Sequence, residues 1–118
     1  MKTKKQFVSA ILQLYLALPE TASRLSKLDY RLAEDLYDKG ISQQNIETAM
    51  LLTTARRLAR SPQAPQLAPI RSLHYFMPAL HEVTGKQMPA GYLEYLRTNL
   101  QGLLKKPVAG FRQSSQTE

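Results

Sequence analysis

Apolar residues recur at helical spacing along most of this chain, and no segment alternates apolar and polar residues as a half-buried strand does. A period of three to four places apolar side chains on one face of a helix, whereas a strand needs a period of two. The helical pattern occurs in five segments that proline, glycine or serine separates. We therefore predict an all-α fold, a compact bundle of about five helices with a candidate helix-turn-helix and a flexible C-terminal tail.

The first two predicted helices have clear start and stop signals. Residues 4–18 form the first, and Pro19 ends it because proline has no amide to donate. The second begins at Ser26, where Asp29 takes the place of the usual glutamate in a capping box. Gly40 ends it, because glycine readily adopts the left-handed conformation. The predicted buried face of this second helix consists of Leu28, Leu32, Leu36 and Tyr37.

Prolines organise the second half of the predicted fold. A long third helix begins at Ser42, and an extended, partly rigid linker with three prolines, residues 61–69, follows it. The fourth helix begins near Pro69, and Pro78 within it predicts a kink or a break. Pro89 begins the fifth helix.

The length of 118 residues suits one hydrophobic core, and the chain shows no internal repeat. We predict a single helical domain over residues 1–104. From residue 105 onward the chain is polar and lacks core-forming residues, so residues 105–118 are predicted to form a basic mobile tail.

Composition argues against catalysis. The chain has no cysteine, no glycine-rich phosphate loop and no Ser-His-Asp arrangement. His74 and His81 lie two turns apart with only Glu82 nearby, which is too few ligands for a metal site. We expect neither enzymatic activity nor a metal or cofactor. The apolar run over residues 7–18 is too short to span a bilayer, so we expect a cytoplasmic protein without membrane contact.

The basic residues are unevenly distributed. The formal net charge is +7, and no acidic residue occurs between Glu47 and Glu82. Such segregation gives one side of a fold a positive potential, which favours nucleic acid as the partner. An ordinary basic surface, with arginines that offset the dipole at a helix C-terminus, is the alternative. The predicted phosphate contacts are Arg56, Arg57, Arg60, Arg71, Lys105 and Lys106.

The segment around Gly40 resembles a DNA-binding helix-turn-helix. Gly40 permits a tight turn, Ile41 and Ile46 hold the two helices together, and Ser42 caps the second. Leu36 stands where such motifs usually have a small residue, and a glycine- and serine-capped helical hairpin is the alternative. If the motif is present, the base-contacting residues are Gln43, Gln44, Asn45 and Thr48, whose amide and hydroxyl groups suit base edges.

Aromatic and basic residues meet in the fourth predicted helix. His74 and Tyr75 follow Arg71 at a spacing at which rings can stack on unpaired bases. The same spacing is also typical of core aromatic residues, which is the alternative.

Residues 28–83, and especially the stretch Ile-Arg-Ser-Leu-His-Tyr-Phe over residues 70–76, resemble helical domains of DnaD-like and plasmid or phage replication-initiation proteins. The chain is also similar to small proteins encoded beside recombinases on bacterial mobile elements. This resemblance implies a setting in DNA replication, recombination or transposition. Pro78, directly after the aromatic pair, departs from the continuous final helix of those domains, so no residue role is carried over.

The leading hypothesis is a non-enzymatic nucleic-acid-binding accessory protein, with DNA favoured over RNA and a recombinase or replication protein as a further partner. Two alternatives remain. One is a small helical subunit of a larger nucleoprotein complex, and the other is an adaptor or inhibitor whose basic face binds an acidic protein.

Overall fold

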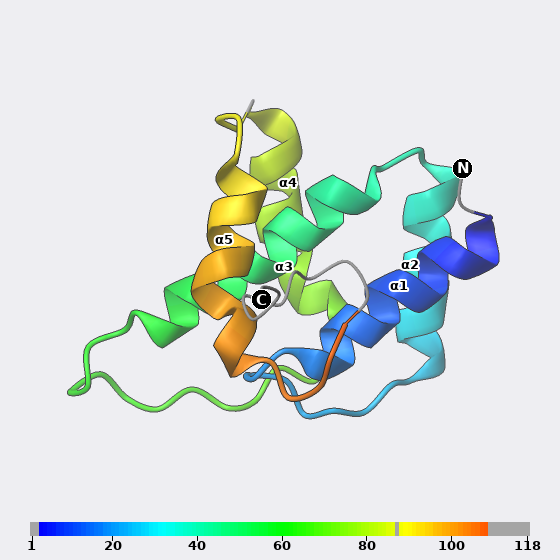
Figure 1. Ribbon diagram of the computed structural model, residues 1–118. Helices are drawn as coiled ribbons and strands as arrows, with labels where there is room; N and C mark the ends of the chain where they lie inside the picture. The colour runs from blue at the N-terminus through cyan, green and yellow to red at the C-terminus, as the bar shows by residue number, and fades with distance from the viewer. Residues whose placement is uncertain (1–2, 87, 109–118) are drawn as a thin grey trace.

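The computed structural model describes residues 3–86 and 88–108 of the chain. The all-α prediction is confirmed, because the described residues form five α-helices and two short 3₁₀ helices (Figure 1). None of these helices is both long and apolar enough to cross a membrane. In chain order the elements are α1 (Lys4–Ala17), α2 (Lys27–Asp38), α3 (Gln43–Leu58), the 3₁₀ helix η1 (Leu73–Phe76), α4 (Met77–Gly85), α5 (Tyr92–Leu100) and the 3₁₀ helix η2 (Gln101–Leu103).

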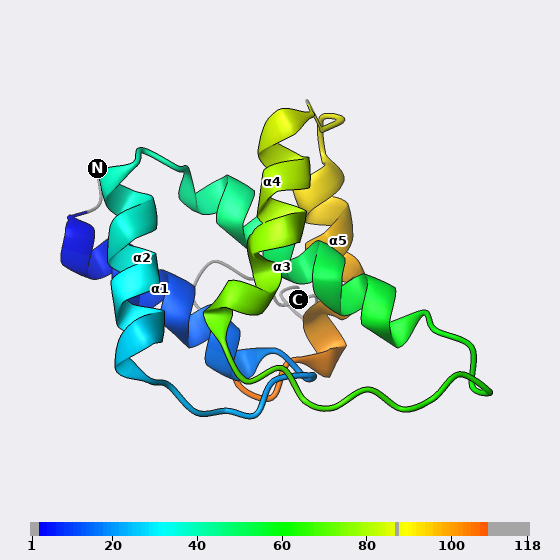
Figure 2. The same cartoon turned by 180° about the vertical axis from the view of Figure 1, so that it is seen from behind.

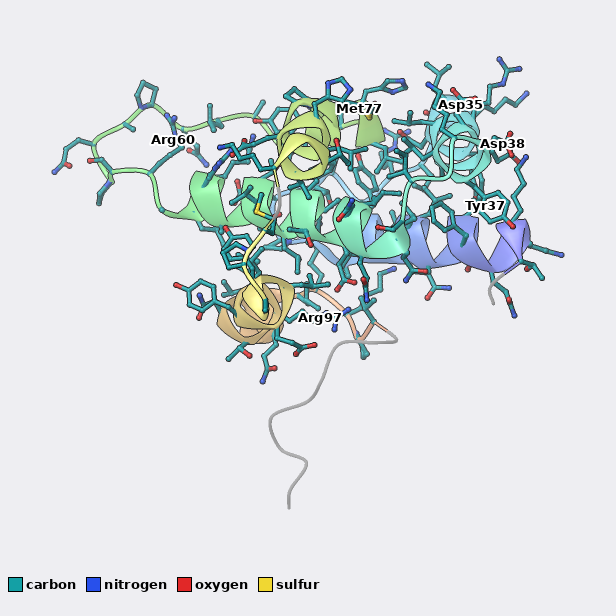
Figure 3. The ribbon with its side chains drawn as sticks, turned by 90° about the horizontal axis from the view of Figure 1, so that it is seen from above. Asp35, Tyr37, Asp38, Arg60, Met77 and Arg97 are labelled. Carbon is teal, nitrogen blue, oxygen red and sulfur yellow. The ribbon has the colours of Figure 1, made fainter. Side chains whose placement is uncertain are left out.

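Helix α3 is the central element of the fold. Helices α4 and α5 pack on opposite sides of it, and α1 packs against it as well (Figure 3). Because neighbours surround α3, its buried residues are not confined to one narrow stripe. They are Ile46, Glu47, Thr48, Ala49, Met50, Leu51, Leu52 and Thr54. Helix α2 packs mainly against α1 and η1, at one end of the molecule (Figure 2).

The predicted capping signals of α2 and α3 are present. The carboxylate of Asp29 accepts a hydrogen bond from the Ser26 amide at 2.9 Å, as the capping box requires. Gly40 has a φ of +76°, and the Ser42 hydroxyl accepts from the Asn45 amide at 3.0 Å. These local signals fix where the two helices end and begin.

The predicted buried face of α2 is wrong at Leu28, which is 61% exposed. Asp29 is fully buried instead, and its second carboxylate oxygen accepts from the Leu73 amide of η1 at 2.8 Å. That tertiary hydrogen bond turns Asp29, Ala33 and Leu36 inward, since positions i, i+4 and i+7 share a helix face. Leu28 is thereby turned toward solvent.

The fourth and fifth predicted helices begin later than expected. Pro69 lies in extended chain, and the amide of Ile70 donates to the Glu20 carbonyl at 2.8 Å. The predicted kink or break at Pro78 takes the form of a change of helix type just before it: η1 ends at Phe76, α4 follows directly from Met77, and Pro78 lies in the first turn of α4, where no amide is needed. Helix α5 begins at Tyr92, not at Pro89.

The folded domain extends past the predicted boundary at residue 104. The backbone amide of Lys105 donates to the Ala17 carbonyl at 2.7 Å, and its ammonium donates to the Thr21 carbonyl at 2.6 Å. Val108 packs against the core. Residues 105–108 therefore belong to the domain, and the rest of the predicted tail, residues 109–118, lies outside the described residues.

Candidate nucleic-acid interface

An open groove of about 560 Å³ lies between the C-terminal half of α3, the proline-containing linker and the start of α4. It brings together three of the predicted phosphate-binding arginines and both predicted stacking residues. We call it the arginine groove and define it by Arg56, Arg57, Arg60, Leu67, His74 and Tyr75. The linker, which was expected to be extended throughout, begins with a turn in which the Ala64 amide donates to the Ser61 carbonyl at 2.9 Å, and it arches away from α3 (Figure 1). Its residue in the groove is Leu67.

Arg57 is a structural residue within this groove. Its side chain is only 6% exposed, and its Nε donates to Glu20 Oε1 at 2.8 Å. Its two terminal nitrogens donate to the Ala68 carbonyl at 2.6 Å and to the Tyr75 hydroxyl at 2.9 Å. Burial acts to lower the pKa of Arg57, but the hydrogen bonds with Glu20 and Tyr75 outweigh it, and the net pKa is raised. Arg57 therefore ties three segments together and has little capacity left for a phosphate.

Arg56 is half-exposed but paired. Its two terminal nitrogens donate to both carboxylate oxygens of Glu82, at 2.9 and 2.7 Å. The hydrogen bond raises the pKa of Arg56 and lowers the pKa of Glu82, so both groups stay charged. This bidentate geometry compensates the positive charge of Arg56.

Of the three groove arginines, Arg60 alone has no carboxylate partner among the described residues. It is exposed, and its Nη2 donates to the Pro65 carbonyl at 2.8 Å. Figure 3 shows Arg60 beyond the last turn of α3, inside the curve of the linker. Arg71, also predicted to contact phosphate, is exposed on the extended segment before η1 and does not line the groove.

The aromatic ring of Tyr75 lines the groove and is held in place by its neighbours. The guanidinium carbon of Arg57 lies 5.4 Å from the centroid of its ring, and the ring of Phe76 meets it edge-on at 5.9 Å. Even so, Tyr75 remains 45% exposed. His74 is exposed beside it, with Nδ1 at 3.3 Å from the Ser72 hydroxyl. The alternative interpretation, that these aromatic residues belong to the core, holds for Phe76, which is buried, but not for Tyr75.

The opposite end of α3 is less open than the helix-turn-helix interpretation requires. Gln44, Asn45 and Thr48 face a small hollow of about 270 Å³ whose other wall is formed by residues 88–97. Thr48 is buried, and its hydroxyl donates to the Gln44 carbonyl at 2.8 Å. The predicted role of Thr48 in base contact is therefore wrong, because its side chain is engaged within the fold.

Contacts between α3 and α5 explain why the N-terminal end of α3 is covered. Glu47 is buried and accepts from Nε and Nη2 of Arg97 on α5, at 2.7 and 2.8 Å. These bonds hold α5 against the first half of α3. Gln43 is half-buried, and its side-chain oxygen Oε1 is enclosed without a hydrogen-bond partner among the described residues. Gln44 is exposed. The helix-turn-helix stays a prediction whose base-contacting surface is reduced mainly to Gln44 and part of Asn45.

The two predicted lysine contacts differ. The Lys105 ammonium is bound to Thr21 and Ser23, and burial, followed by the charge of Lys106, lowers its pKa. Lys106 is exposed. Lys105 therefore serves mainly to hold the segment around residue 105 against the α1–α2 loop, and Lys106 stays available to an anion.

The residues missed from the sequence are the acidic partners Glu20, Glu82 and Glu47. Each lies 26 or more positions from its arginine: 37 for Glu20, 26 for Glu82 and 50 for Glu47. No local spacing signals such pairs, because they form only when distant segments pack together.

Comparison with protein-family models, with curated proteins and with solved structures finds no match for this chain.

Proposed function

We propose that this chain is a non-enzymatic nucleic-acid-binding accessory protein that uses the arginine groove to contact the phosphate backbone. The observation that carries the proposal is the position of Arg60. Its guanidinium has no carboxylate partner among the described residues and lies in a groove that also holds an open aromatic ring. A guanidinium suits phosphate because its planar donors can engage two oxygens at once.

Exposure to solvent and ion pairing decide which of the predicted cations can contact phosphate. Arg60, Arg71 and Lys106 are exposed, and none of them forms an ion pair within the described part of the chain. Arg56 is compensated by Glu82, and Arg57 is buried. We therefore assign phosphate contact to Arg60 first, and to Arg71 and Lys106 second.

The proposed setting is DNA replication, recombination or transposition, with DNA favoured over RNA. It rests on the resemblance of residues 28–83 to replication-initiation domains. A recombinase or a replication protein is the proposed protein partner, since only three of the six predicted phosphate contacts keep that role, and a domain with few phosphate contacts is expected to bind DNA weakly alone.

A second candidate function is a subunit or adaptor that contacts another protein. The observation that favours it is an apolar groove of about 660 Å³ between α1 and α2, lined by residues that include Leu12, Leu16, Leu25 and Tyr30. Tyr30 is about half exposed, and Leu28 is exposed on the same helix. Contiguous exposed apolar surface often marks protein contact sites.

Fluorescence anisotropy with labelled DNA across a salt series tests the proposed function. The double variant Arg60→Gln/Arg71→Gln should lower the affinity, and the slope of log affinity against log salt should become shallower by about 0.7–0.9 for each phosphate that is no longer bound. The control is Lys5→Gln/Lys39→Gln, which removes two exposed cations where α1 begins and α2 ends, at the opposite end of the molecule (Figure 1); Lys39 lies 3.9 Å from the carboxylate of Asp35. Equal effects of the two variants would mean that only net charge matters, which would contradict the groove assignment.

A further inference from the structure

The ring of Tyr75 is fixed in orientation before any ligand arrives. Its hydroxyl accepts from Nη1 of Arg57 at 2.9 Å, the guanidinium of Arg57 lies against one face, and Phe76 meets its edge. Arg57 is in turn held by Glu20 and by the Ala68 carbonyl. A ring held in this way loses little freedom on binding, which favours affinity.

Part of the ring is open to solvent. The side chain of Arg57 is only 6% exposed, whereas Tyr75 is 45% exposed, so the guanidinium covers only part of the ring. The ring also lines the arginine groove, together with Arg60. A flat apolar face and a free cation are therefore open to the same space.

We propose that the arginine groove binds an unpaired nucleotide, with its base stacked on Tyr75 and its phosphate on Arg60. This inference rests on the proposed function and adds to it the class of nucleic acid. Stacking on an aromatic ring requires a base whose face is accessible, as in a single strand. In a duplex the base faces are covered by neighbouring base pairs. The protein should therefore prefer single-stranded to double-stranded DNA of the same sequence.

His74 extends the same surface. It is exposed, adjacent to Tyr75 and part of the groove, so it contacts the sugar or the next base along the strand. Leu67, which is also exposed, supplies apolar contact from the linker wall. The site thus combines a stacking ring, a cation and an apolar wall, as sequence-tolerant single-strand sites do.

The test is anisotropy with an oligothymidylate and with its duplex, at fixed salt. Tyr75→Leu should weaken single-strand binding by about fivefold to a hundredfold without changing the salt slope, because stacking releases no counterions. Tyr75→Phe, which keeps the ring, should retain most of the affinity. Tyr95→Leu is the matched control, because Tyr95 is 60% exposed but lies on α5, outside the groove.

Photocrosslinking keeps the proposal falsifiable if Tyr75→Leu folds poorly. An oligothymidylate that carries 5-bromouracil should crosslink to Tyr75 in the unmodified protein, as located by mass spectrometry. Adducts confined to Tyr30 or Tyr95, two other exposed tyrosines, would overturn the proposal, and so would equal affinity for single strand and duplex.

The two proposals fail in different ways. If Tyr75→Leu is folded and binds as the parent does, while Arg60→Gln/Arg71→Gln weakens binding, the phosphate role stands and the stacking site is wrong. If neither form of DNA binds at all, the proposed function fails and the stacking site fails with it.

Discussion

Both ends of α3 carry polar residues that the sequence marks as candidate contacts for nucleic acid, but the fold covers one end and leaves the other open. The N-terminal end holds the amide residues Gln43, Gln44 and Asn45, and the C-terminal end holds Arg56 and Arg57, with Arg60 two residues beyond it. Helix α5 lies along the first end and is fastened by the Glu47–Arg97 pair. The second end borders an open groove.

Polar residues on a helix form a binding surface only where nothing packs against them. At each end of α3, exposure to solvent also differs between nearby residues. Arg57 is buried while Arg60 is exposed, and Thr48 is buried while Gln44 is exposed. Which residues can meet a ligand is therefore decided by the neighbouring elements.

The largest expected effect is on the free energy of unfolding, and it distinguishes Arg57 from Arg60 near the C-terminal end of α3. Arg57→Gln should lower the free energy of unfolding by about 2–4 kcal/mol, because the partly buried Glu20 and the Ala68 carbonyl are left without their donor. Arg60→Gln should change it by less than about 0.5 kcal/mol, as exposed substitutions usually do. Urea denaturation measures both. Equal stabilities would mean that Arg57 is not the buried tie that its hydrogen bonds indicate.

An intermediate effect is expected at the N-terminal end. Glu47→Gln should lower the free energy of unfolding by about 1–2 kcal/mol, since it removes a charged acceptor from a mostly buried pair with Arg97. The control is Glu94→Gln, because Glu94 also pairs with Arg97 but is largely exposed. It should have a smaller effect. If the two variants lower the free energy of unfolding equally, the ion pair of Glu47 with Arg97 does not hold α5 over this end of α3.

The smallest expected effect concerns the exposed pair at the groove, Arg56 with Glu82. The pKa of Glu82 is lowered in the folded protein, chiefly by its hydrogen bond with Arg56. The pair therefore contributes stability above the ordinary glutamate pKa of 4.5, and this contribution is lost as the pH falls below it. The difference in urea midpoint between the parent and Glu82→Gln should shrink from pH 7 to pH 3. A difference that grows toward acid pH would contradict the shift.

Several features of the fold followed from local sequence signals. Pro19, Ser26, Gly40 and Ser42 mark helix boundaries where the structure has them, because capping and the left-handed turn depend on residues within one helical turn. Phe7, Ile11, Leu14 and Tyr15 recur at helical spacing in the sequence, and all four are buried in α1. The rotation of α2 could not be predicted from spacing, because the Asp29–Leu73 bond crosses 44 positions.

The sequence by itself determined the helical class, most helix boundaries and the excess of cations that favours an anionic partner. Tertiary structure decided which cations are free. Glu20, Glu82 and Glu47 reach their arginines only after the loop between α1 and α2, helix α4 and helix α5 have packed around α3. The physical reason is range: capping and periodicity act within about one turn of helix, whereas burial and ion pairing depend on segments that only the folded chain brings together.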